Sequence, residues 1–167
     1  VTAVDAKDHK YLLEVWAESV GSAVMMQKLF DLASKWNVET VHIEGYAGQA
    51  LLLPAFNAMA EMLGTRLRLQ ALEGFVQSSI GPLTRNKEAR IAALAPYFER
   101  GEIYIQQGQM KFMEEYSRFP KGRTVDILDA LAYGPAVWRR ALSYSDMVGI
   151  MERQQLLEAG RNPVTGY

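Results

Sequence analysis

The sequence predicts an α/β domain organised around a mixed β-sheet. Short runs of β-branched and apolar residues alternate along the chain with longer segments in which apolar residues recur at helical spacing. This alternation of strand and helix patterns is typical of a sheet with helices packed against it. The chain has 167 residues, of which 49% are hydrophobic, and no repeat or low-complexity tract divides it. We therefore expect a single domain over residues 1–167, with residues 142–167 as a C-terminal helix and tail.

The first half of the chain predicts three strand regions and two helices. Residues 1–20 predict a β-hairpin, because apolar and aromatic runs flank the polar turn KDHK. Residues 21–36 have apolar side chains at helical spacing and predict an amphipathic helix. Residues 38–45 are short, apolar and β-branched, which is typical of a buried strand. The patterns that follow predict a helix over residues 47–64 and a strand over residues 66–72.

The second half begins with a segment rich in glycine, serine, proline and asparagine, residues 74–86, which predicts a long loop. Loops of this length in a compact domain usually have a functional reason. We expect a helix over residues 87–101, a short strand over 102–105 and a helix over 108–119. A further helix is expected over residues 124–142, interrupted at its Gly-Pro pair, before the polar C-terminal helix.

Composition narrows the chemistry that the chain can perform. No apolar run approaches the roughly 18 to 20 residues of a membrane-spanning helix, and the N-terminus does not resemble a signal peptide, so we expect a cytoplasmic protein without membrane contact. The chain has no cysteine and two histidines, His9 and His42, so a metal ion would be held mainly by carboxylates. The net charge of −1 favours no class of partner.

Three acids form a candidate metal site. Asp126 and Asp129 lie three residues apart in a predicted helix and therefore share one face, among apolar neighbours. Glu44 lies at the end of the predicted strand 38–45, where a sheet presents functional groups. Two carboxylates so close repel each other unless a cation lies between them, and an all-oxygen site suits Mg²⁺ or Mn²⁺. Paired ions of this kind activate water and stabilise the leaving oxygen of a phosphodiester, as in nucleases.

Each of these acids also has an ordinary structural interpretation. Asp126 is equally well placed to occupy the N-cap or first turn of its helix, where the helix dipole favours an acid. Asp129 has the alternative of a buried ion pair with Arg90 or Arg123. Glu44 has the alternative of interacting with the N-terminus of the following helix.

The order of several motifs gives a more specific expectation. The runs IEGYAGQALL, NKEARIAALAPYFERGEIYI and EEYSRFPKGRTVDILDALAYG together resemble the C-terminal nuclease domain of the large subunit of tailed-phage terminases. The resemblance covers about residues 1–138. It departs from the family at Thr124, Val125 and Asp126, where the family often has a longer His/Asp-Asp cluster. The matching positions are Glu44, Lys87, Arg90, Gly101, Glu115, Phe119, Pro120, Gly122, Asp126, Asp129 and Ala130.

The resemblance implies an RNase H-like fold, with a central mixed β-sheet flanked by helices on both faces. It implies metal-dependent endonucleolytic cleavage of double-stranded DNA during phage genome packaging, with a two-ion Mg²⁺ or Mn²⁺ site. Glu44 would be the second metal-binding carboxylate, and Asp126 and Asp129 would supply the third carboxylate position of the metal site. The first strand and its aspartate are expected to be lacking, since residues 1–6 resemble the family's second strand, and we interpret Asp5 and Asp8 as turn residues.

The resemblance also implies partners. These are the terminase ATPase domain, the small terminase subunit and the portal, in the host cell cytoplasm, with the isolated domain monomeric. The chain has no G-x-x-x-x-G-K-[ST] motif and is not expected to be the ATPase itself. Two rival functions remain, namely another RNase H-like nuclease such as a junction resolvase, and a non-catalytic DNA-binding or assembly domain.

Basic residues on both sides of the acids are candidates for holding DNA phosphates. Each of these residues alone is more simply interpreted as a solvated surface charge. His42 is more simply interpreted as a core residue or a neighbour of the site than as a metal ligand. The expected DNA-binding residues are Arg85, Lys87, Arg90, Lys121 and Arg123.

Overall fold

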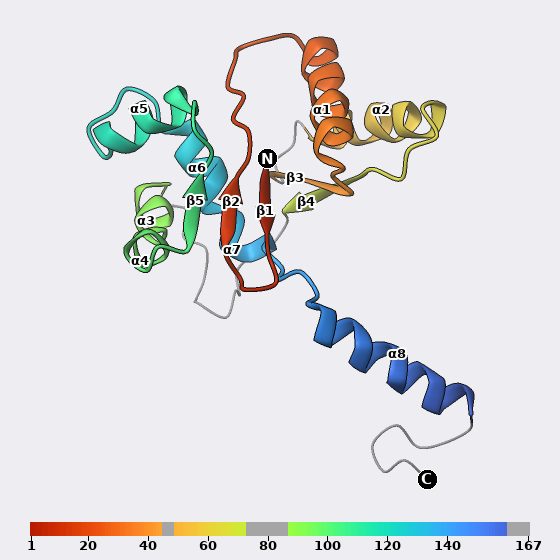
Figure 1. Cartoon of the computed structure of the whole chain (residues 1–167). Helices are drawn as coiled ribbons and strands as arrows, with labels where there is room; N and C mark the ends of the chain where they lie inside the picture. The colour runs from red at the N-terminus through yellow and green to blue at the C-terminus, as the bar shows by residue number, and fades with distance from the viewer. Residues whose placement is uncertain (45–48, 73–86, 160–167) are drawn as a thin grey trace.

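The computed structural model describes residues 1–44, 49–72 and 87–159, and it confirms an α/β architecture (Figure 1). Its strands form two separate small sheets, each with its own helices. The strands are β1 (Thr2–Val4), β2 (Lys10–Leu12), β3 (Thr40–Glu44), β4 (Arg68–Leu72) and β5 (Ile103–Ile105). The helices are α1 (Ser22–Trp36), α2 (Gln49–Met62), α3 (Lys87–Ala92), α4 (Ala95–Glu99), α5 (Met110–Arg118), α6 (Asp126–Ala132), α7 (Gly134–Val137) and α8 (Tyr144–Glu158).

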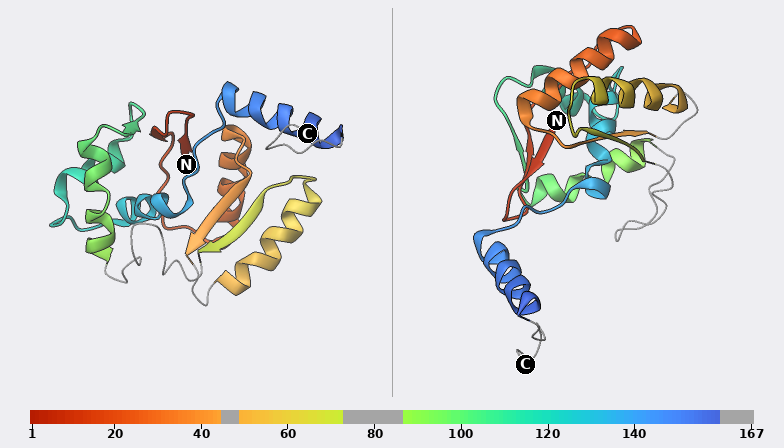
Figure 2. Two further views of the ribbon diagram at one scale, coloured as in Figure 1. Left: turned by 90° about the horizontal axis from the view of Figure 1, so that it is seen from below. Right: turned by 90° about the vertical axis from the view of Figure 1, so that its right-hand side faces the viewer.

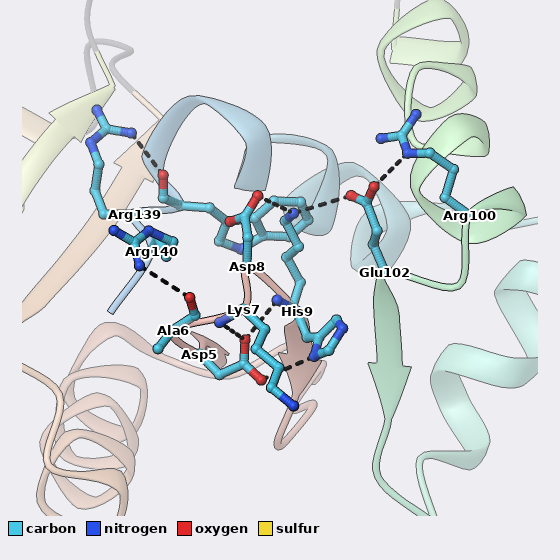
Figure 3. Close-up of polar contacts among 11 residues, drawn as sticks. Asp5, Ala6, Lys7, Asp8, His9, Arg100, Glu102, Arg139 and Arg140 are labelled. Carbon is cyan, nitrogen blue, oxygen red and sulfur yellow. Dashed lines mark hydrogen bonds and ion pairs between the residues drawn. The ribbon is translucent and has the colours of Figure 1, made fainter. Parts of the chain in front are cut away.

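The first sheet has the strand order β1-β2-β5. The predicted hairpin is confirmed, because β1 and β2 pair antiparallel, and β5 joins β2 in parallel. Asp5 fixes the turn by accepting hydrogen bonds of 2.8 Å from the backbone N–H groups of Lys7 and His9 (Figure 3). Asp8 adopts a φ of 68°, a left-handed conformation that aspartate tolerates better than most residues. Both aspartates are therefore turn residues, as the sequence predicts.

A buried lysine attaches this hairpin to β5. The Nζ of Lys10 lies 3.0 Å from Asp8 and 3.1 Å from Glu102, which itself pairs with Arg100 (Figure 3). Burial by itself lowers the pKa of Lys10, but the hydrogen bonds to the two carboxylates outweigh burial and raise the pKa. The buried ammonium is therefore charged and paired, as a buried charge requires.

The first sheet and the second pack against separate hydrophobic clusters. Strands β3 and β4 pair in parallel, and α1 and α2 cover them. The cluster around them has stacked Phe30 and Phe56 rings, 4.9 Å apart, at its centre. The other cluster joins β2 to α3, α5 and α6 and contains Leu12, Leu94 and Phe112. The main apolar packing thus lies within each half of the molecule, and the two sheets have no strand pairing in the described part of the chain.

Several sequence expectations need correction. One central sheet was expected, whereas the described strands form two sheets. The helix expected over 87–101 is broken into α3 and α4, because a tight turn before Pro96 interrupts it. The interrupted helix 124–142 is shorter than expected and comprises α6 and α7. The predicted loop 74–86 lies outside the described residues.

Helix α8 extends away from the rest of the molecule in Figure 1 and in the right-hand view of Figure 2. Ser143 and Asp146 form a reciprocal capping box that fixes its first turn. Several of its apolar side chains, including Tyr144 and Met151, are exposed. None of the helices in the described part of the chain is both long and apolar enough to cross a membrane.

Candidate functional site

A cavity of about 1500 Å³ lies between the two sheets and contains the acids that the sequence singles out. Glu44 reaches it from the end of β3, and Asp126 and Asp129 reach it from α6. These elements are far apart in the sequence, so the fold brings the three predicted acids to one cavity. Glu115 of α5 also lines it.

Glu115 determines where α6 begins. Its buried carboxylate accepts hydrogen bonds of 2.9 and 3.1 Å from the backbone N–H groups of Ile127 and Leu128. These are N–H groups that a helix start leaves without an intrahelical acceptor. With the helix starting there, Asp126 and Asp129 both lie in its first turn. The sequence alternative for Asp126, a first-turn acid, is therefore confirmed.

Both α6 acids are paired with cations from α3. Arg90 binds Asp129 through its Nε at 2.8 Å and a terminal nitrogen at 2.5 Å. Lys87 lies 2.7 Å from Asp126 and 3.7 Å from Asp129. The hydrogen bond to Asp126 is the main reason that the pKa of Lys87 is raised. The sequence alternative of an Arg90–Asp129 ion pair is thus confirmed, and Lys87 and Arg90 are engaged by acids.

Glu44 is bound by a residue that the sequence analysis missed. The Tyr133 hydroxyl donates a hydrogen bond of 2.7 Å to Oε1 of Glu44. Burial raises the pKa of Tyr133, and the hydrogen bond to Glu44 raises it further. The Arg90 guanidinium lies 4.5 Å from the centre of the Tyr133 ring, in cation–π geometry. A continuous series of contacts therefore runs from Glu44 through Tyr133 and Arg90 to Asp129.

The three acids have suitable chemistry for Mg²⁺ or Mn²⁺ but are not gathered as ligands. Hard oxygen donors suit these ions. Among the residues that the structure describes, no three acidic or histidine side chains lie close enough together to hold a metal ion. In the observed arrangement Lys87 and Arg90 neutralise Asp126 and Asp129. A cation at this site would have to replace Lys87.

Of the remaining predicted DNA-binding residues, Arg123 is exposed and lines the cavity, and Lys121 is exposed on the surface. Arg85 lies outside the described residues. Three further cations, which the sequence analysis did not select, line the cavity: Lys111, Arg118 and Arg139.

His42 lies on the cavity wall two residues before Glu44. Its Nδ1 is buried and has no hydrogen-bond partner among the residues that the structure describes. Burial is the main reason that its pKa is lowered, and the nearby charge of Arg139 acts in the same direction. The neutral imidazole is therefore favoured here, next to an acid that Tyr133 already binds.

The chain matches no protein-family model, and searches of the curated proteins and of the solved structures find no similar protein. The candidate site is therefore defined by the chain's own residues. It consists of Glu44, Asp126 and Asp129 in a shared cavity, with Tyr133, Lys87 and Arg90 as their immediate partners.

Proposed function

We propose that this chain is the nuclease domain of a phage terminase large subunit, with an RNase H-like fold, and that it cleaves double-stranded DNA in a metal-dependent reaction. The observation that carries this proposal is the convergence of Glu44, Asp126 and Asp129 on one cavity. The cations Lys111, Arg118, Arg123 and Arg139 line the same cavity and are suited to contact phosphates.

Each group has a defined part in this proposal. Glu44, Asp126 and Asp129 hold Mg²⁺ or Mn²⁺, which when bound supplies Lewis acidity and an activated water. Tyr133 orients Glu44 by its 2.7 Å hydrogen bond. Arg90 orients Asp129, while Lys87 leaves the acids and contacts the DNA backbone. The exposed position of the Asp126 carboxylate leaves room for this exchange of partners.

The biological setting belongs to the same proposal. The domain acts on packaged DNA in the host cytoplasm, beside the terminase ATPase domain, the small subunit and the portal. The support for this setting is the ordered set of sequence motifs from IEGYAGQALL to VDILDALAYG.

A second candidate is a DNA-binding or assembly domain without catalysis. The specific observation in its favour is the neutralisation of both α6 acids by Lys87 and Arg90. Such a domain binds DNA without metal, and its affinity falls steeply with salt because phosphate contacts release counterions.

The test is nicking of supercoiled plasmid in Mn²⁺ or Mg²⁺ by the wild type and by Asp126→Asn and Glu44→Gln. These substitutions keep side-chain shape, and Asp126 is exposed, so folding is retained. We expect metal-dependent nicking that falls at least about 100-fold in both variants and is unchanged in Asp31→Asn, an exposed acid on α1. Salt-sensitive DNA binding without nicking in any metal would instead establish the second candidate.

A further inference from the structure

Two tyrosines lie side by side on one face of the first sheet. On strands β2 and β5, Leu12 and Ile105 pack into the hydrophobic cluster on the other face. Side chains alternate along a strand, so Tyr11 and Tyr104 lie on the opposite face of the sheet. The two tyrosines are direct partners in the strand register, and their rings stack with centroids 5.2 Å apart and planes inclined by 21°.

The outer sides of this ring pair are open. On β1 the register partner of Tyr11 is Ala3, whose methyl side chain is too short to cover a tyrosine ring. Strand β5 is an edge of the sheet, so no described strand flanks Tyr104, which is 45% exposed. A cross-strand aromatic pair stabilises a sheet, but stabilisation does not require exposed rings. The open sides give flat aromatic groups room to stack.

The orientation of both rings is fixed by the hairpin turn. The Tyr11 hydroxyl donates a hydrogen bond of 3.0 Å to Oδ2 of Asp5. The His9 ring lies edge-on to Tyr104, with centroids 5.2 Å apart, and its Nδ1 lies 3.0 Å from the same Asp5 oxygen. Because the rings are already ordered, a ligand that stacks on them pays little entropic cost for fixing them.

Exposed cations surround the turn that adjoins the rings. In Figure 3, Arg140 and Arg100 lie on opposite sides of the turn, with Lys7 between them, and all three are exposed. Arg100 pairs with Glu102 and Arg140 with Asp146. A guanidinium group has five N–H donors, so each arginine can also donate to a phosphate. The turn therefore offers positive charge beside two stacking surfaces.

We propose that this surface binds single-stranded DNA, with bases stacked on the tyrosines and phosphates held by the cations. Aromatic faces combined with cations are the groups that single strands require, whereas the bases of a duplex already stack on each other. DNA is favoured over RNA because Asp5 already accepts four hydrogen bonds and has no capacity for one from a 2′-hydroxyl. The surface consists of Tyr11, Tyr104, Lys7, Arg100 and Arg140. This proposal is independent of the nuclease proposal, since binding requires neither metal nor cleavage.

The test is fluorescence anisotropy of the full chain with a labelled oligonucleotide of about eight thymidines, in EDTA so that no metal-dependent cleavage occurs. Tyr104→Leu keeps an apolar side chain on the strand but has no aromatic face, and it should weaken binding at least about tenfold. Tyr104→Phe keeps the aromatic face and should bind within about twofold of the wild type. Tyr144→Leu, at an exposed position on α8, is the matched control and should have no effect. Unchanged affinity of the Tyr104→Leu variant would overturn the proposal.

Three further ligands separate stacking from charge in the unmodified protein. An abasic DNA oligomer of the same length keeps the phosphates without the bases, and it should bind at least about tenfold more weakly. A uridine RNA of the same length and a DNA duplex should also bind more weakly than the thymidine oligonucleotide. Equal binding of the abasic oligomer would refute base stacking, and tighter binding of the RNA or the duplex would refute the assignment to single-stranded DNA.

The contribution of the cations has its own measurement. Each phosphate contact releases counterions, so Lys7→Gln should make the dependence of affinity on salt shallower. Arg66→Gln removes the same charge from an exposed position before β4 and should leave the salt dependence unchanged. Identical salt dependence in the Lys7 and Arg66 variants would contradict the placement of phosphates at the turn.

Discussion

The hydroxyl of Tyr133 donates a 2.7 Å hydrogen bond to Glu44, which lies 89 residues earlier in the chain. This bond links the half of the molecule built on β3 and β4 to the half that contains α6. Since the two halves have separate hydrophobic clusters, a polar contact between them has more influence on the position of Glu44 than it would have in a continuous core.

Tyr133→Phe should therefore reduce stability and release Glu44. The variant keeps the ring beneath Arg90 and loses only the hydroxyl, so we expect the free energy of unfolding to fall by about 1 kcal/mol. A double-mutant cycle with Glu44→Ala, measured by urea denaturation, should give a coupling energy of similar size. Tyr144→Phe, at an exposed position on α8, is the matched control and should have no effect. A coupling energy of zero would mean that the hydrogen bond does not join the two halves in solution.

Local features of the fold were predictable from the sequence, and its long-range features were not. The turn at Asp5 and Asp8 and the helix α1 depend on neighbouring residues, so the sequence pattern locates them closely. The separation of the strands into two sheets depends on pairing between distant segments, which no local pattern specifies. The helix expected over 87–101 breaks before Pro96, which has no N–H to continue the helical hydrogen bonds, although the apolar residues keep helical spacing.

The candidate site shows the same division. The acids Asp126, Asp129 and Glu44 were selectable by residue type and spacing. Tyr133 was missed, although it lies four residues after Asp129 and so on the same side of its helix, a spacing that offered a signal. The sequence could not decide whether these acids bind a metal ion or a cationic side chain, because the Arg90–Asp129 pair joins two helices far apart in the chain.

Asp129 and Asp126 should differ sharply in their contribution to stability. The side chain of Arg90 is 8% exposed and that of Asp129 15%, whereas that of Asp126 is 74% exposed. Removing one partner of a buried ion pair is far more costly than removing one of an exposed pair, so Asp129→Asn should cost about 3 kcal/mol and Asp126→Asn less than about 1 kcal/mol. Chemical denaturation of both variants measures this difference. Equal losses would show that Arg90 and Asp129 are not paired as observed.

Glu115 should be essential for the start of α6. Its carboxylate accepts two backbone hydrogen bonds in a buried position, so Glu115→Ala should lower the free energy of unfolding by about 2–3 kcal/mol. Glu114→Ala is the matched control, because that neighbouring acid is exposed and forms an exposed ion pair with Arg118, four residues later. Fraying of α6 in the Glu115 variant should also appear as faster amide exchange at Ile127 and Leu128. Comparable stability of the two variants would contradict the capping role.

Glu102 should make stability depend on pH in the acid range. Hydrogen bonding to Arg100, aided by Lys10, lowers the pKa of Glu102 from 4.5 to about 2, although burial acts in the opposite direction. A carboxylate with a lowered pKa stabilises the folded state above its unfolded pKa, and this stabilisation is lost as the pH falls from about 4.5 towards 2. The stability difference between wild type and Glu102→Gln should therefore be largest near pH 6 and shrink towards pH 2. Glu99→Gln, at an exposed neighbouring position, is the matched control for the loss of one negative charge.

Lys87 should control whether the α6 acids accept a metal ion. Its ammonium lies 2.7 Å from Asp126 and 3.7 Å from Asp129, and so occupies the position that a cation would take between them. Lys87→Met keeps the length of the side chain but removes its charge, and we expect Mn²⁺ affinity, measured by calorimetry, to rise about tenfold. The same variant should bind DNA more weakly, with a shallower dependence on salt.

Lys121→Met, at an exposed position, is the control for the change in net charge and should leave Mn²⁺ affinity unaltered. Unchanged or weaker Mn²⁺ binding in the Lys87 variant would mean that Asp126 and Asp129 serve as partners of cationic side chains and not as metal ligands.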